Sequence, residues 1–178
     1  MKNTAIVTGA SSGIGREISR VLVEMGYEVY GFGREFPEEE VYFHPIVCDL
    51  LNTPELERQI KEIRRRNDVS LLVNNAGVGY YGLHEELNVQ KIQKLVRTNL
   101  EVPMVLTNLL LRDLKKYSGT VINISSVTAQ LSNPHGCAYG ATKAGLSSFS
   151  RSLFDEVRKY GVRVVTIQPD MTKTDLYR

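Results

Sequence analysis

The chain has 178 residues, of which 42% are hydrophobic and 24% are charged, and its formal net charge is +2. This length fits one domain with a sizeable core, and the composition excludes a disordered, collagen-like or coiled-coil chain. A charge this close to zero gives no reason to expect a nucleic-acid or membrane-surface binder. We therefore predict one domain over residues 1–178.

The N-terminus and the cysteines together predict a cytoplasmic protein. Residues 1–4 lead directly into a strand-like run without an apolar signal segment, and no stretch has the ~20 apolar residues of a membrane span. Cys48 and Cys137 are isolated, with no CxxC pair and no zinc spacing, which favours a reducing compartment. The three histidines show no metal-ligand spacing either, so we predict no metal site.

Short β-branched runs alternate with longer amphipathic stretches along the chain. In chain order, the predicted elements are a strand at 5–7, a helix at 14–24, strands at 28–32 and 41–47, a helix from residue 53, a strand at 71–73, a helix at 89–116, a strand at 121–124, a helix at 138–160 and a strand at 162–167. Thr53 is the predicted N-cap of its helix, with Pro54 as the first helical residue. Pro45 marks a strained place in the third strand, and Pro103 should kink or interrupt the long helix.

This alternation predicts the fold class. Strands with nearly continuous apolar sequence are typical of a parallel sheet that is covered on both faces. Right-handed crossovers then give a doubly wound α/β fold of the Rossmann type, with about six strands.

The first strand–helix turn is rich in glycine: Thr8-Gly9-Ala10-Ser11-Ser12-Gly13-Ile14-Gly15. Glycines allow a tight turn and a close approach of the backbone to a pyrophosphate, and the helix N-terminus supplies free N–H groups. We therefore predict cofactor binding by Gly9, Ser11, Ser12, Gly13, Ile14 and Gly15. The alternative is a Gly-Ser turn that binds no ligand.

Tyr139 and Lys143 are four residues apart in a predicted helix, so they share one face. An ammonium near a phenol lowers the phenol's pKa from its usual value near 10, so the pair can exchange a proton with a carbonyl or an alcohol. Ser126 can hydrogen-bond the same substrate oxygen, while the hydride must come from a cofactor. Alternatively, each residue alone could be a surface lysine, a strand-end serine or a buried tyrosine.

The order of these motifs resembles that of the short-chain dehydrogenase/reductase superfamily, and in particular its carbonyl reductases and 3-oxoacyl-carrier-protein reductases. The resemblance rests on the Gly-x-x-x-Gly-x-Gly spacing from Gly9, on Asn74-Asn75-Ala76-Gly77 after the fourth strand, and on the Tyr-x-x-x-Lys of Tyr139 and Lys143. It implies a catalytic set of Asn99, Ser126, Tyr139 and Lys143.

The resemblance also implies how a dinucleotide would lie. Lys143 would hold the nicotinamide ribose together with Tyr139, and Asn99 would anchor a water that links Lys143 to solvent. Further cofactor-binding residues implied by the family pattern are Asp49, Leu50, Asn75, Ala76, Gly77, Pro169 and Thr174. Asp49 has an alternative interpretation as a cap or turn residue near residues 52–53.

The cofactor choice depends on the end of the second strand. In an NAD-dependent relative an acidic residue there receives the ribose hydroxyls, but that position is Gly33 in this chain and is followed by Arg34. A glycine leaves room for a 2′-phosphate and the arginine supplies its charge partner, so NADP(H) is favoured while NAD(H) stays possible. Alternatively, Arg34 is a solvated loop residue.

The C-terminal part departs from the family pattern. Pro169-Asp170 replaces the usual Pro-Gly, and the chain ends at Arg178, where the family continues into a substrate-covering segment and a seventh strand. We expect an exposed apolar edge along the sixth strand and a less enclosed substrate pocket. His135, Cys137 and residues 79–81 are candidates for the border of that pocket, and the favoured alternative for His135 and Cys137 is that they only shape their loop.

The sequence thus predicts an NADP(H)-dependent oxidoreductase that acts on a small-molecule carbonyl or alcohol. The alternatives are a nucleotide-binding protein with little turnover and, less favoured, a sugar-nucleotide epimerase or dehydratase. By the resemblance we expect a homodimer through the helices near 100–116 and 138–160, and loss of the family's tetramer. The candidate residues for the dimer face, each of which could also face the core, are Val105, Leu109, Phe149, Leu153 and Val157.

Overall fold

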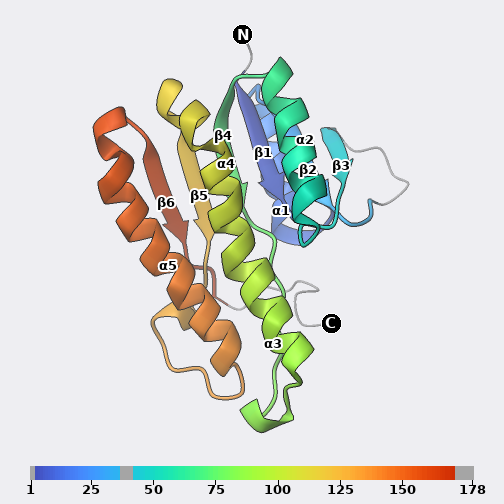
Figure 1. Ribbon diagram of the computed structural model, residues 1–178, viewed down its shortest axis with the longest axis vertical. Coiled ribbons are helices and arrows are strands. Elements are labelled where there is room, and N and C mark those ends of the chain that lie inside the picture. The colour runs from blue at the N-terminus through green and yellow to red at the C-terminus, as the bar shows by residue number, and fades with distance from the viewer. Residues whose placement is uncertain (1–2, 37–41, 171–178) are drawn as a thin grey trace.

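A six-stranded parallel sheet forms the centre of the protein in a computed structural model, which describes residues 3–36 and 42–170 (Figure 1). The strands are β1 (Thr4–Thr8), β2 (Glu28–Gly33), β3 (His44–Val47), β4 (Val69–Asn74), β5 (Thr120–Ile124) and β6 (Arg163–Ile167), in the spatial order β3-β2-β1-β4-β5-β6. All neighbours pair in parallel, and the direction of winding reverses between β1 and β4. The predicted doubly wound sheet is confirmed.

Helices cover both faces of this sheet. The helices are α1 (Gly13–Glu24), α2 (Thr53–Arg66), α3 (Val89–Val96), α4 (Val102–Lys116) and α5 (Cys137–Val157), with short turns η1 (His84–Glu86), η2 (Arg97–Glu101), η3 (Val127–Ala129) and η4 (Arg158–Tyr160). Helices α2, α4 and α5 lie in front of the sheet in Figure 1, and α1 lies behind it. None of the helices in the described part of the chain is long and apolar enough to cross a bilayer.

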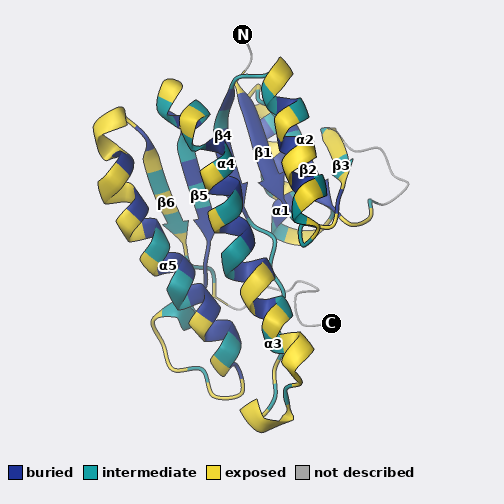
Figure 2. Ribbon diagram, in the orientation of Figure 1, coloured by how far each residue is buried: buried dark blue, intermediate teal, exposed yellow. Residues whose placement is uncertain are grey.

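The apolar runs in the central strands follow from this two-sided packing. Every residue of β1 is buried, as Figure 2 shows for the middle of the sheet. Ile6 packs with the residues of α2, α4 and α5, whereas its neighbours Ala5 and Val7 pack with those of α1. Since successive side chains point to opposite faces, covering on both sides explains why the three middle residues of β1 are all apolar.

The structure differs from the predicted elements at the start of α2. The N-cap is Asn52 and not Thr53: the Asn52 side chain accepts a hydrogen bond from the N–H of Glu55, at 3.3 Å. Asparagine is a better cap than threonine, and Thr53 and Pro54 instead form the first helical positions.

The predicted long helix is interrupted, as its proline suggested. Residues Arg97–Glu101 form a single wide π-helical turn, and α4 starts afresh at Val102 with Pro103 in its first turn. Proline has no N–H to donate to the preceding turn and its ring crowds the carbonyl four residues back, which favours a break at this point. Pro45 lies in β3, an edge strand of the described sheet, where a missing N–H is tolerated. Val41, the first residue of the predicted third strand, lies outside the described residues.

At the opposite edge, β6 has no strand beyond it among residues 3–36 and 42–170. Val165 and Ile167 are 41% and 44% exposed, so the expected open apolar edge is present in this part of the chain. Of the two interpretations for the dimer-face candidates, Leu153 and Val157 take the second, because they point toward the sheet and are buried in the core. The thiols of Cys48 and Cys137 are both free.

Candidate functional site

A cavity of about 720 Å³ opens at the carboxyl ends of the strands, where the winding of the sheet reverses. In a doubly wound sheet this switch point is the usual place for a ligand. The predicted site residues that line the cavity are Gly9, Ser11, Ser12, Gly13, Ile14, Arg34, Asp49, Leu50, Asn75, Ala76, Gly77, Ser126, Tyr139, Lys143 and Pro169. Gly15 and Asn99 do not line it, and Thr174 lies outside the described residues.

The glycine-rich turn forms one wall as a backbone cradle. Gly9 has a φ of +66°, and a Cβ atom added to Gly15 would lie 2.1 Å from the Gly9 carbonyl oxygen, so no other residue fits at position 15 without a shift. Helix α1 begins at Gly13 with no side-chain cap from Ser12 and with no acidic residue in its first turn. The N–H groups of this turn and the positive end of the helix dipole therefore suit an anion such as a diphosphate.

Asn75 and Thr8 join this cradle to the loop after β4. The Asn75 side chain donates hydrogen bonds to the carbonyl oxygens of Thr8 and Gly9, at 3.0 and 3.3 Å. In return, the backbone N–H groups of Asn75 and Ala76 both donate to the Thr8 hydroxyl oxygen at 3.0 Å. These bonds fix the distance between the two walls of the cavity.

The opposite end of the cavity holds Ser126, Tyr139 and Lys143. Tyr139 and Lys143 lie on the same face of α5, both buried, and Ser126 follows β5 as the N-cap of η3. The Lys143 Nζ donates to the Ile124 carbonyl oxygen at 2.9 Å and lies 5.8 Å from the centre of the Tyr139 ring. Burial lowers the pKa of Lys143 to about 8. At neutral pH a buried cation therefore stands beside a phenol, which favours the phenolate form of that phenol.

Asn99 does not line the cavity, but its hydrogen bonds hold two of the segments that form this end. Its side-chain oxygen accepts from the Val78 N–H at 2.8 Å, and its amide nitrogen donates to the Val78 carbonyl at 2.9 Å and to the Thr142 hydroxyl at 3.2 Å. Thr142 is the residue before Lys143 and itself donates to the Tyr139 carbonyl oxygen at 2.7 Å. Asn99 therefore ties the loop after β4 to the turn of α5 that carries the tyrosine and the lysine.

The other end of the cavity lies at the tip of β2. Gly33 and Arg34 line it, and a Cβ atom added to Gly33 would lie only 3.0 Å from the Ser11 Cβ atom. A larger residue at Gly33 would therefore crowd the glycine-rich turn. Asp49 both lines the cavity and accepts a hydrogen bond from the Leu51 N–H at 3.0 Å, so the turn interpretation and the binding interpretation are compatible.

The border of the cavity differs from the prediction in part. Tyr81 lines it, but His135 and Cys137 do not and are exposed. The loop that carries them is bonded to the loop around Tyr81, since the Gly82 N–H donates to the His135 carbonyl at 2.9 Å and the Asn133 side chain donates to the Tyr81 hydroxyl at 3.3 Å.

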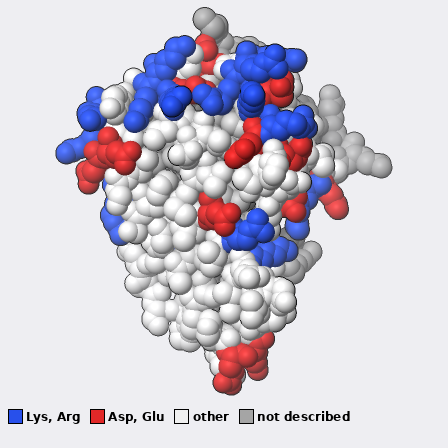
Figure 3. Space-filling model, viewed as in Figure 1, with Lys and Arg blue, Asp and Glu red and all other residues white. Residues whose placement is uncertain are grey.

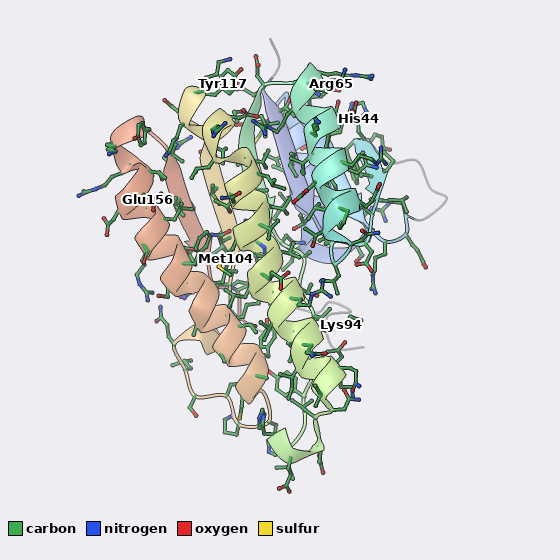
Figure 4. The ribbon with its side chains drawn as sticks, in the orientation of Figure 1. His44, Arg65, Lys94, Met104, Tyr117 and Glu156 are labelled. Carbon is green, nitrogen blue, oxygen red and sulfur yellow. The ribbon has the colours of Figure 1, made fainter. Side chains whose placement is uncertain are left out.

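Several residues that were not predicted also line the cavity, among them Val78, Lys94, Thr98, Thr128 and Asn133. Lys94, which is labelled in Figure 4, comes from α3. For Thr98 and Thr128 the only sequence signal was proximity, because Thr98 precedes Asn99 and Thr128 stands two residues after Ser126.

Comparisons of the sequence and of the fold with known proteins all find dehydrogenases and reductases. The family model described as short chain dehydrogenase matches residues 3–178. Serine 3-dehydrogenase from Agrobacterium fabrum is 34% identical, over 98% of this chain and 74% of its own length. NADPH-dependent 3-dehydrocapnine reductase from Ornithobacterium rhinotracheale is 32% identical, over 97% of this chain and 66% of its own. A crystal structure of a short-chain dehydrogenase from Streptomyces avermitilis superposes with a TM-score of 0.89 at 32% identity, covering 99% of this chain and 68% of that one.

Proposed function

The chain belongs to the short-chain dehydrogenase family of oxidoreductases, and from this premise we propose that it transfers a hydride between NADP(H) and a carbonyl or alcohol substrate. One observation carries the proposal beyond family membership. Ser126, Tyr139 and Lys143 line the same cavity as the glycine-rich cradle, so a dinucleotide lying in the cradle would reach the three side chains.

In the direction of reduction, a bound nicotinamide would supply the hydride for the carbonyl carbon, and the residues of the cavity would handle the proton. Ser126 donates a hydrogen bond to the carbonyl oxygen and holds it beside the phenol. Tyr139 gives its phenolic proton to that oxygen as negative charge develops there, and the Lys143 ammonium stabilises the phenolate that remains. Oxidation of an alcohol follows the same steps in reverse.

The chain's own residues would hold the cofactor along the cavity. The amides of residues 13–15 suit the diphosphate, Asp49 and Leu50 the adenine, and Tyr139 and Lys143 the nicotinamide ribose. Asn75, Ala76, Gly77 and Pro169 border the nicotinamide end, and Thr174 remains a prediction from the family pattern. The preference for NADP(H) is supported by the absence of a side chain at Gly33, by the guanidinium of Arg34 at the same end, and by a relative named as NADPH-dependent.

The decisive experiment is turnover by Tyr139→Phe. NADPH oxidation is followed with a panel of aldehydes, ketones and β-keto esters, and NADPH binding is measured separately by fluorescence. The variant keeps the ring and loses the proton, so we expect turnover to fall by about 10²–10⁴-fold while NADPH binding is kept. Tyr160→Phe, at an exposed tyrosine, should behave as the wild type.

Two outcomes would count against the proposal. If Tyr139→Phe retained most of the wild-type turnover, the proton would come from another group. If the wild type bound NADPH but turned over nothing in the panel, the alternative of a nucleotide-binding protein without turnover would be favoured.

We further propose a homodimer formed by α4 and α5. Figure 3 shows a broad face with few charged side chains over the middle and lower parts of these two helices. Met104 on α4 and Phe154 on α5 are 38% and 42% exposed, and Figure 4 shows Met104 on the side of α4 that faces α5. Two such faces brought together would remove both side chains from water.

A further inference from the structure

The hydroxyl oxygen of Ser126 receives two hydrogen bonds from a single residue. The Thr128 backbone N–H donates to the Ser126 Oγ at 3.2 Å, and the Thr128 hydroxyl donates to the same atom at 2.9 Å. Ser126 is 7% exposed, and both residues line the cavity. Thr128 therefore contacts the oxygen that the proposed reaction uses.

Counting donors and acceptors shows what these two bonds do. A serine hydroxyl has one proton to donate and two lone pairs that accept. Both lone pairs of Ser126 are engaged by Thr128, so the proton is the part of the hydroxyl that remains for a ligand in the cavity. A carbonyl or alkoxide oxygen can only accept, so it needs this proton and would be repelled by a lone pair.

We infer that Thr128 is a positioning residue that turns the Ser126 hydroxyl into a hydrogen-bond donor toward the substrate oxygen. The inference rests on the proposed function, because it deepens the role given there to Ser126. Thr128 does not touch the reacting atoms in this account and acts only by orienting the serine.

The surroundings of Thr128 hold it in place for this role. It is the middle residue of η3, whose ends are fixed by hydrogen bonds from the Ala129 N–H to the Ser126 carbonyl at 3.0 Å and from the Val127 N–H to the Pro169 carbonyl at 3.3 Å. The turn packs closely on α5, since a Cβ atom added to Gly140 would lie 3.3 Å from the Thr128 carbonyl oxygen. A β-branched side chain on a fixed backbone has few rotamers, so its hydroxyl stays aimed at Ser126.

A double-mutant cycle tests the inference. The kcat of each variant is measured with NADPH and a carbonyl compound that the wild-type enzyme reduces. Thr128→Val keeps the shape and the backbone N–H but loses the hydroxyl, and we expect kcat to fall about 10-fold, the usual effect of one lost hydrogen bond, with NADPH affinity unchanged. Thr128→Ser restores the donor and should stay within about 2-fold of the wild type. In a Ser126→Ala background, Thr128→Val should have no further effect, because there is no hydroxyl left to orient.

The matched control is Thr120→Val, the same change at the other end of β5, which should leave kcat as in the wild type. Additive effects of Thr128→Val and Ser126→Ala would overturn the inference, because Thr128 would then act on the substrate or on folding by itself. Equal losses in Thr128→Val and Thr128→Ser would overturn it as well.

A second readout does not depend on turnover. Neutron diffraction from deuterium-exchanged crystals locates the two hydroxyl deuterons directly. We expect the Thr128 deuteron on the line to the Ser126 Oγ and the Ser126 deuteron in the cavity. A Ser126 deuteron pointing at the Thr128 oxygen would overturn the inference even if the enzyme is active. An inactive enzyme with the expected deuterons would instead refute the proposed function and leave the orientation by Thr128 standing.

Discussion

Lys143 carries a positive charge in a place that water hardly reaches. Lys143 is only 4% exposed, and this burial lowers its pKa from 10.5 to about 8. In the unfolded chain the pKa returns to its ordinary value, so between pH 8 and 10.5 the unfolded state binds more protons than the native state. The free energy of unfolding should therefore rise with pH across this window, and this contribution is lost as the pH falls through 8.

The difference between the two pKa values corresponds to about 3 kcal/mol. Urea unfolding of the wild type and of Lys143→Met, measured from pH 7 to 11, should show this rise in the wild type and a flatter profile in the variant. Lys61→Met, at an exposed lysine of α2, should keep the wild-type profile. Parallel profiles for the wild type and Lys143→Met would show that burial does not shift this lysine.

Arg34 is the residue on which the choice between the two nicotinamide cofactors depends. Arg34 lines the cavity beside Gly33, at the end where the proposed 2′-phosphate would lie. Arg34→Ala should weaken NADPH binding by about 10- to 100-fold through loss of a charge-assisted hydrogen bond, and leave NADH binding nearly unchanged. Fluorescence titration with both cofactors measures this, and Arg20→Ala, at an exposed arginine of α1, is the control. An equal loss for NADPH and NADH would exclude recognition of the 2′-phosphate by Arg34.

At the scale of elements, the fold could be predicted from the sequence because the central strands contain short, mainly apolar runs and the helices between them are amphipathic. The runs 5–7, 71–73 and 121–124 correspond to β1, β4 and β5, and local spacing alone was enough to find them. The cap of α2 was misplaced by one residue, because Asn52 and Thr53 are both capping residues and sequence alone does not show which one keeps a non-helical backbone.

The candidate site was predictable where its residues are close in the chain or follow a strand end. Tyr139 and Lys143 share a helix face by spacing, and the glycine-rich turn follows a strand. Lys94 and Asn133 were not predictable, because the arrangement of α3 and of the loop before α5 brings them to the cavity from positions without a local pattern. The buried core positions of Leu153 and Val157 likewise depend on how α5 is rotated against the sheet.

Asn99, in the π turn before α4, connects the loop after β4 to α5 through its side-chain hydrogen bonds. Its side chain is nearly fully buried and bonds both backbone groups of Val78, so Asn99→Ala leaves a donor and an acceptor without partners. We expect the free energy of unfolding to fall by about 2–3 kcal/mol, and turnover to fall with it. Asn52→Ala, the loss of an exposed cap of α2, should lower stability by only about 1 kcal/mol and leave turnover unchanged. Urea unfolding measures the stability of both variants and NADPH oxidation measures their turnover. Equal losses of stability and turnover in the two variants would exclude this connecting role of Asn99.

At the scale of the whole molecule, many of the basic side chains gather far from the cavity. Figure 3 shows lysines and arginines gathered at the pole opposite the cavity, where α2 and α4 end. The last turns of these helices carry Arg64, Arg65 and Arg66 in α2 and Lys115 and Lys116 in α4. Positive side chains stabilise helix C-termini, and Arg64 is also paired with Asp113 at 2.7 Å. This pole therefore has an explanation within the fold, and the face with few charged residues is the one that suggests a partner.

The proposed dimer gives that face a second copy of the same chain. Phe154→Glu places a charge at the centre of the contact, and a buried unpaired charge strongly disfavours association. We expect the wild type to have the mass of a dimer in light scattering at high micromolar concentration, with and without NADPH, and Phe154→Glu to have the mass of a monomer. Val21→Glu is the control, since Val21 is 43% exposed on α1, on the other face of the sheet. A wild-type monomer at these concentrations would exclude the dimer. A dimer of Phe154→Glu would show that the interface lies on another surface. The open sheet edge at Val165 and Ile167 would then be the next surface to test.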